Sequence, residues 1–260
     1  MQIPFAVPFP EDSPATAIYI EQIGELSDAI AQLGLPTQRP VLVIIGGAKF
    51  LAAAEFDRLR VLFQESIVPI AEQWNAVVLD GGTQSGVMQL MGESRRDRSA
   101  QFPLVGVAPA ALVQLPASVS AGRGQGSGSG MTQKDPVQLE PHHTHFILVP
   151  GTAWGDESAT LAHLAQAIAQ GAPIVTLLCN GGEVTWQDAW ENVKQRHPLI
   201  VLAGTGRAAD DIANTLRGLI QNERALALLN LSQVQRSCLQ VVDLEAGPLA
   251  LTQAIATIFS

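Results

Sequence analysis

The stretch Leu199-Ile200-Val201-Leu202-Ala203-Gly204-Thr205-Gly206-Arg207 decides the fold class of this chain. Its first five residues form an apolar run too short for a helix, and a run of this kind between a proline and a glycine is typical of a buried strand. After the glycine-rich turn, apolar residues recur at helical spacing from Arg207 to Ile220. A strand, a glycine-rich turn and a helix in this order point backbone N–H groups at an anion, with the helix dipole behind them. The alternative is that the glycines serve only a tight connection.

The same order of elements recurs along the chain. Strands alternate with helices, which is typical of a doubly wound, mainly parallel, Rossmann-like α/β sheet with helices on both faces. We therefore predict a single domain over residues 1–260, with residues 1–14 as an extended N-terminal arm. Strands are expected at 41–45, 76–80, 104–108, 145–149, 173–179, 199–203 and 239–243, and helices at 15–33, 50–74, 87–98, 156–171, 184–195, 207–220, 223–234 and 249–259.

Glycines follow several of the predicted strands, at the edge of the sheet where ligands bind. In open parallel sheets ligands lie beyond the carboxyl ends of the strands, at the point where the strand order reverses. Glycine lets the backbone approach a ligand closely, and the first turn of a helix offers amides to a phosphate. The candidate ligand-binding residues are Gly46, Gly47, Ala48, Gly81, Gly82, Thr83, Gly86, Val87, Gly151, Thr152, Gly181, Gly182, Gly204, Thr205, Gly206 and Arg207.

Some polar and aromatic residues allow two interpretations. Glu157 is a candidate general acid or base, but an acidic residue at the start of a helix also complements the dipole. Trp154 can stack on a base or anchor a surface loop. The histidines before and within one predicted strand have no ligand spacing for a metal, so turn or packing roles are favoured over contact with a ligand; they are His142, His143 and His145.

Composition excludes several classes of function. The net charge of −9 argues against nucleic-acid binding, which depends on cationic surface. No apolar run approaches the length that crosses a membrane, and the N-terminus lacks the pattern of a signal peptide, so a cytoplasmic location is expected. Cys179 and Cys238 are expected to be reduced packing residues. The sequence predicts no cofactor and no metal.

Residues 117–140 interrupt the alternation of strands and helices. Glycine recurs there among serine, arginine and glutamine, a composition typical of flexible segments. A segment of this length is either functional or disordered. We consider both a mobile flap over the ligand cleft and a plain disordered loop.

The motifs together resemble the SLOG superfamily of Rossmann-like domains. They match its LSDAT branch, which is similar to the N-terminal homology region of melastatin-type TRP channels, and they follow in the family's order from about residue 40 to 215. The resemblance implies a nucleotide-derived ligand such as ADP-ribose or a nucleoside phosphate, a stand-alone prokaryotic-type member rather than a channel, and a homo-oligomer. The matching stretches are Val43–Ala48, Asp80–Met88 with Gly92-Glu93, Leu104–Pro109, Pro141–Val149, Gly171–Leu178 with Gly181-Gly182, and Gly204–Asp210.

A second branch of the superfamily contains the cytokinin-activating phosphoribohydrolases, whose signature is Pro-Gly-Gly-x-Gly-Thr-x-x-Glu. This chain has Pro150-Gly151-Thr152-Ala153-Trp154-Gly155-Asp156-Glu157 at that place. The proline, the first glycine and an acidic residue agree, whereas the second glycine and the Gly-Thr pair do not align. By this resemblance Glu157 would be the catalytic residue.

Three hypotheses follow from the sequence. The first is a ligand sensor that binds a nucleotide-derived molecule and controls a separately encoded effector protein. The second is a nucleotide hydrolase that cleaves an N-glycosidic or phosphate bond. The third is an assembly module in which the glycine-rich edge is structural. The altered hydrolase signature favours the first over the second.

Overall fold

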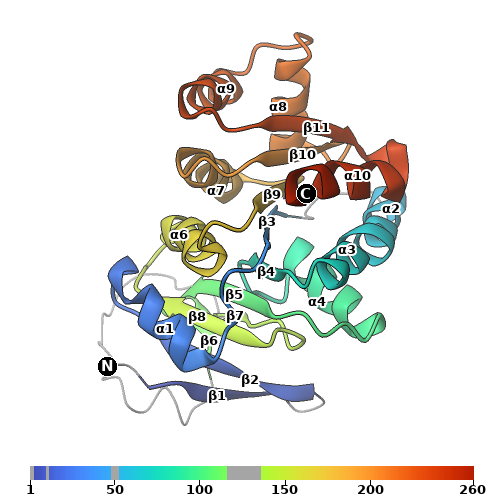
Figure 1. Ribbon diagram of the computed structural model, residues 1–260. Coiled ribbons are helices and arrows are strands. Elements are labelled where there is room, and N and C mark those ends of the chain that lie inside the picture. The colour runs from blue at the N-terminus through green and yellow to red at the C-terminus, as the bar shows by residue number, and fades with distance from the viewer. Residues whose placement is uncertain (1–2, 10–11, 48–52, 116–135) are drawn as a thin grey trace.

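A computed structural model describes residues 3–9, 12–47, 53–115 and 136–260 of the chain. Within these ranges nine strands form one sheet in the order β1-β2-β8-β5-β4-β3-β9-β10-β11 (Figure 1). Only β1 and β2 pair in antiparallel orientation in this sheet, and all its other neighbours are parallel. The predicted α/β class is therefore confirmed. The strands are β1 (Phe5–Phe9), β2 (Asp12–Tyr19), β3 (Val41–Gly46), β4 (Val77–Asp80), β5 (Leu104–Pro109), β8 (His145–Val149), β9 (Ile174–Cys179), β10 (Leu199–Ala203) and β11 (Leu239–Asp243).

Helices cover both faces of the sheet, which Figure 1 shows nearly edge-on. One face carries α1 (Leu26–Leu33), α6 (Ser158–Ala169), α7 (Glu183–Lys194), α8 (Arg207–Leu216) and α9 (Glu223–Gln235). The other face carries α2 (Ala53–Leu62), α3 (Val68–Gln73), α4 (Gly86–Asp97) and α10 (Gly247–Phe259). In the described part of the chain, no helix is both long and apolar enough to cross a membrane.

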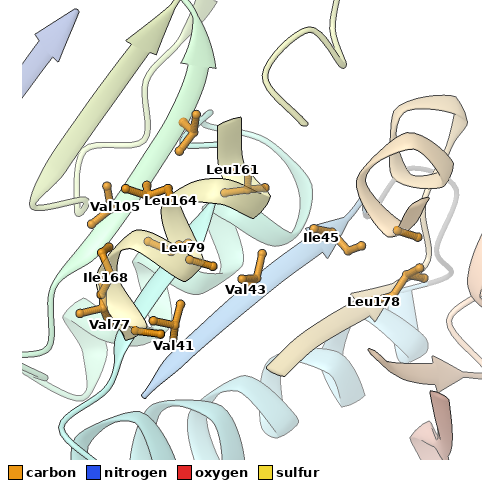
Figure 2. Close-up of a cluster of buried hydrophobic side chains, with 14 of the residues drawn as sticks. Val41, Val43, Ile45, Val77, Leu79, Val105, Leu161, Leu164, Ile168 and Leu178 are labelled. Carbon is orange, nitrogen blue, oxygen red and sulfur yellow. The ribbon is translucent and has the colours of Figure 1, made fainter. Parts of the chain in front are cut away.

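Alternate residues of the central strands enter the two cores. Val43 and Ile45 of β3 face α6, whereas Leu42 and Ile44 belong to the core on the opposite face. Figure 2 shows the first of these cores, where Leu161, Leu164 and Ile168 of α6 lie over β3, β4 and β5. A strand that is covered on both faces needs apolar residues at every position, which explains the continuous apolar runs in the sequence.

The strand order reverses between β3 and β9. From β3 the chain proceeds to β4, β5 and β8 on one side, and from β9 it proceeds to β10 and β11 on the other. The two strands pair along their whole length, ending with Gly46 opposite Cys179. A side chain at Gly46 would overlap the carbonyl oxygen of Cys179, and the positive φ of +137° also favours glycine. The tight strand end at the reversal point therefore requires a glycine.

The N-terminal segment differs from the prediction. In the described residues, β1 and the start of β2 take the place of the arm expected over 1–14. The helix expected over 15–33 is confirmed only in its second half, where a 3₁₀ turn at Ile23–Glu25 leads into α1. Thr16 to Tyr19 pair with β8 in parallel, and Ala15, Ala17 and Ile18 are buried. Burial beside an existing strand edge outweighed the weak helical spacing of these residues.

Three other segments also differ from their predicted bounds. The helix expected over 50–74 is α2, a π-helical turn at Phe63–Ile67 and α3, because Pro69 lacks the N–H that a continuous helix would use there. The helix expected over 207–220 ends at Leu216. Most of the predicted flap lies at residues 116–135, outside the described residues, but Val137–Gln138 (β7) pairs with Val113–Gln114 (β6) and is not loop.

We expect Gly46→Ala to lower the free energy of unfolding by about 3 kcal/mol or more, because the methyl group meets the Cys179 carbonyl in a strained backbone conformation. Urea denaturation measures this. Gly24→Ala is the matched control, since a Cβ at Gly24 meets open space; it should change stability by less than about 1 kcal/mol. Equal stabilities of the two variants would contradict the assignment.

Candidate functional site

A cavity of about 370 Å³ opens at the carboxyl ends of the central strands. Its walls come from the ends of β3 and β4, from the starts of α4, α6 and α7, and from the first residue of α8. This is where the reversal of strand order leaves a crevice in doubly wound sheets. The volume lies at the lower end of the range for small-molecule pockets, which is about 300–1,000 Å³.

The cavity brings together only part of the predicted set. The candidates that line it are Gly46, Gly47, Gly81, Thr83, Gly86, Glu157, Gly182 and Arg207. Ala48 lies outside the described residues. The other candidates are placed away from the lining: Gly82, Val87, Gly151, Thr152, Gly181, Gly204, Thr205 and Gly206.

Two helices begin at the cavity wall and offer backbone donors. Gly86, the first residue of α4, and Glu183, the first residue of α7, both line the cavity. The first amides of a helix have no carbonyl partner within the helix, and they carry the positive end of its dipole. The N-cap residue of α4, Ser85, makes no side-chain hydrogen bond to them, and the N-cap of α7 is Gly182, which has no side chain that could do so. The cavity therefore faces two helix N-termini suited to an anion.

Arg207 adds a positive charge to this wall. The residue opens α8 with a positive φ of +54°, which is unusual for a residue with a side chain. A Cβ placed on Gly182 would approach Nη2 of Arg207 to 2.9 Å, so the guanidinium lies against the glycine at the start of α7. The glycine thus makes room for the arginine at the cavity.

The Gly204-Thr205-Gly206 turn has a structural role. The Thr205 hydroxyl donates to the Leu202 carbonyl at 2.6 Å and accepts from the Asn180 amide at 2.7 Å. The Gly204 amide donates to Asp210 Oδ1 at 2.6 Å. In α8 the Ala208 and Ala209 amides donate to the Gly181 and Asn180 carbonyls, which follow β9, so these two amides are already paired. These contacts support the alternative interpretation of a tight strand-to-helix connection.

The remaining candidates outside the cavity are also explained by packing. Gly82 donates to Asp80 Oδ1 at 2.7 Å, and its Cα lies against Gly106. Val87 is fully buried in the core of the α4 face. Gly151 and Thr152 lie beside Asp156, whose Oδ2 accepts from the Thr152 amide at 2.8 Å.

Two buried carboxyl groups also line the cavity. Glu157, at the N-cap of α6, accepts from the Gly155 amide at 2.8 Å, and Asp188 of α7 accepts from the Ser158 hydroxyl at 2.6 Å. Burial raises the pKa of Glu157 despite the amide bond. Burial, together with the charge of Glu157, raises the pKa of Asp188 to about 7. Burial thus shifts both carboxyl groups toward the protonated form, in which a carboxyl group can donate a hydrogen bond.

A buried cluster of charged groups supports the turn after β4. His143 lies between Asp80 Oδ1, 2.8 Å from its Nε2, and Glu140 Oε2, 2.7 Å from its Nδ1. Nδ1 of His142 reaches the other oxygen of Glu140 at 2.5 Å. Burial alone would lower the pKa of His143, but the two carboxylates outweigh it and raise the pKa to about 9. His143 is therefore a buried imidazolium at neutral pH.

The cluster fixes the position of the cavity wall. The Glu140 amide donates to the Gly82 carbonyl at 3.0 Å, and the Gln84 amide donates to the Gln138 carbonyl at 2.8 Å. Gly92 of α4 lies so close to the Glu140 carboxylate that no Cβ fits between them. The segment before β8 is thus tied both to the turn at residues 81–86 and to α4.

Sequence reasoning missed Glu140, Asp188 and Thr185 as members of this region. Glu140 could have been found, because it stands immediately before the histidine-rich segment and a buried histidine needs a polar partner. Asp188 and Thr185 lie on α7 among other polar residues, and no local pattern distinguishes them.

The buried imidazolium predicts a dependence of stability on pH. A group with a pKa of about 6.5 in the unfolded chain and about 9 in the folded one gives its full stabilisation below pH 6.5 and loses it as the pH rises through 9. Between pH 6.5 and 9.5 the wild type should lose on the order of 3 kcal/mol relative to His143→Gln, measured by urea denaturation.

A control variant keeps the cluster intact. His163→Gln changes a histidine of α6 that bonds to Gln195 and should retain the wild-type pH profile. Parallel profiles of the wild type and His143→Gln would contradict the assignment of the charge to His143.

Comparison with known proteins assigns the chain to a family. The family described as "SLOG in TRPM, prokaryote" matches residues 39–252. The chain is 28% identical over 196 residues to the Transient receptor potential cation channel subfamily M member-like 2 of Nematostella vectensis, and 26% identical over 230 residues to subfamily M member 2 of Mus musculus. These matches cover 65% and 78% of this chain but only 12% and 14% of the relatives. The chain belongs to the LSDAT family of SLOG domains, the prokaryotic group related to the N-terminal regions of these channels.

Proposed function

We propose that the chain binds a nucleotide-derived molecule in the cavity at the strand ends, with its phosphate groups at the α4 and α7 N-termini. The observation that carries the proposal is the convergence of these two helix starts and Arg207 on one cavity. Backbone amides and a guanidinium together bind phosphate strongly and directionally. Such local donors hold an anion although the chain carries a net charge of −9.

The carboxyl groups of Glu157 and Asp188 favour a ligand that also carries hydroxyl groups. A carboxyl group exchanges hydrogen bonds with the hydroxyls of a sugar, and its protonated form does not repel a phosphate. Burial shifts both groups toward that form, because it raises the pKa of each. A ribose phosphate matches both the donors and the carboxyl groups, and the family resemblance favours ADP-ribose or a nucleoside phosphate within this class.

The proposed role is that of a sensor that passes its ligand state to a separately encoded effector protein. A binding protein needs only the donors and the shape described above. Isothermal titration with ADP-ribose, AMP, ATP and a cyclic dinucleotide tests this role, and recovery of intact ligand distinguishes binding from turnover.

We expect Arg207→Asn to weaken the binding of ADP-ribose or ATP by about tenfold to a hundredfold, because a charge-assisted hydrogen bond to phosphate is lost. Asparagine tolerates the left-handed backbone of this position, so the helix start is retained. Calorimetric Kd values measure the effect.

Arg217→Asn is the matched control at the other end of α8. Its guanidinium forms an exposed ion pair with Asp243 at 2.8 Å, away from the cavity, so affinity should stay within about twofold of wild type. Equal loss in both variants would indicate a non-specific charge effect, and no loss in Arg207→Asn would remove Arg207 from the site.

A hydrolytic activity is the second candidate, and the position of Glu157 in the cavity favours it. In the reaction, the water oxygen bonds to C1′ of the ribose, and the C1′–N bond breaks. The base leaves with the electron pair and receives a proton. A buried glutamate with a raised pKa can supply or accept the proton in such a step.

If the wild type releases base from AMP, we expect Glu157→Gln to lower kcat by at least about a hundredfold, because proton transfer is lost. The Kd for AMP should stay within about threefold, since glutamine keeps the shape. Glu191→Gln, which alters a carboxylate of α7 that pairs with Lys194 and does not line the cavity, should retain turnover. Undiminished turnover in Glu157→Gln would exclude this residue as the acid or base.

A further inference from the structure

A second cavity of about 320 Å³ adjoins the first. The two cavities share Trp154, Glu183 and Val184 in their linings. The second cavity lies between the N-terminal halves of α7 and α9 and the loop before α6. Because of the shared residues, a ligand in the first cavity has this hollow directly beside it.

Indole rings dominate the walls of this second cavity. Trp186 and Trp190 lie one turn apart on α7, and Trp154 approaches from the loop. Trp154 and Trp190 are 38% and 40% exposed, although large aromatic side chains are usually covered. Planar apolar surface is thus presented to solvent within a concave site.

Polar contacts hold the two sides of the second cavity in place. The Gln187 side chain donates from Nε2 to the Gly155 carbonyl at 2.8 Å, which ties the Trp154 loop to α7. Arg224 of α9 donates from Nη1 to Glu183 Oε2 at 2.7 Å and from Nη2 to Glu183 Oε1 at 2.5 Å. The aromatic cavity is therefore braced by contacts at two places on α7.

We infer that the second cavity receives the heteroaromatic base of the ligand while its phosphates lie in the first. This inference rests on the proposed function and names the chemical class more closely: a nucleoside diphosphate or a derivative of one. Any nucleobase can stack on an indole ring, because every base has a flat π-face. Trp154, at the boundary between the cavities, lies where the sugar meets the base.

The shape and the position favour a base over a protein partner. The second cavity is a hollow that continues from the phosphate site, and the arginine at its rim can pair with polar groups of a base. A protein partner would instead use the same tryptophans as exposed anchors. That occupant would reveal itself through the state of association of the chain.

The test compares ADP with inorganic pyrophosphate, which lacks a base. For the wild-type chain, ADP should bind more tightly than pyrophosphate. Trp190→Ala should weaken ADP binding by roughly tenfold to a hundredfold and leave pyrophosphate binding within about twofold. Trp190→Phe keeps a stacking face and should restore most of the affinity for ADP.

A tryptophan on the opposite face provides the matched control. Trp74 packs against Phe259 with ring centroids 5.8 Å apart, and Trp74→Phe should leave both affinities unchanged. In that variant, ADP should still quench the remaining indole fluorescence, whereas pyrophosphate should not. Circular dichroism and light scattering on each variant measure whether the fold and the molar mass differ from those of the wild type.

The outcomes separate this inference from the proposed function. If pyrophosphate and ADP bind equally, or if Trp190→Ala leaves ADP binding intact, the base site is refuted while the phosphate site stands. A lower molar mass of Trp190→Ala with unchanged ADP affinity identifies the surface as a protein interface and also refutes it. If neither compound binds to the wild type, the proposed function fails and the inference fails with it.

Discussion

The contact between Gly46 and the carbonyl group of Cys179 is the constraint on which the site depends. It lies where β3 and β9 pair and where the strand order reverses. From β3 the chain continues toward one edge of the sheet, and from β9 it continues toward the other edge. The helices that follow these two strands therefore diverge and leave the strand ends between them uncovered. The cavity is the space that remains. A side chain at this one position would separate the strands whose close pairing creates it.

The lining of the cavity combines two kinds of group. Helix starts and Arg207 provide hydrogen-bond donors with positive potential, whereas Glu157 and Asp188 provide carboxyl groups that burial shifts toward the neutral form. A ligand with phosphate at one end and hydroxyl groups at the other matches this division. The local arrangement of donors matters more than the net charge of the chain, since neighbouring groups dominate the potential in a partly buried cavity.

Next to this site the chain keeps a buried charged group, although burying an apolar side chain would cost less desolvation free energy. His143 between Asp80 and Glu140 requires every partner, because removing one leaves a buried charge without compensation. The cluster connects the end of β4 to the segment before β8, and the Glu140 carboxylate lies against Gly92 of α4. Its geometry specifies how the turn after β4 lies against the segment before β8. The phosphate wall thus depends on an interaction between residues more than 60 positions apart.

The sequence by itself determined the sheet class and most of its elements. Continuous apolar runs identify strands that are covered on both faces, and the glycines after them mark the ligand edge, because both signals are local. The strand β2 escaped this reasoning, since its pairing with β8 depends on residues far along the chain. For the same reason only the tertiary structure decided which glycines line the cavity and which, like Gly204 and Gly206, lie outside its lining. Asp188 and Glu157 line the same cavity, and His143 is hydrogen-bonded to Asp80. Both pairs arise from packing between distant elements, which no spacing in the sequence encodes.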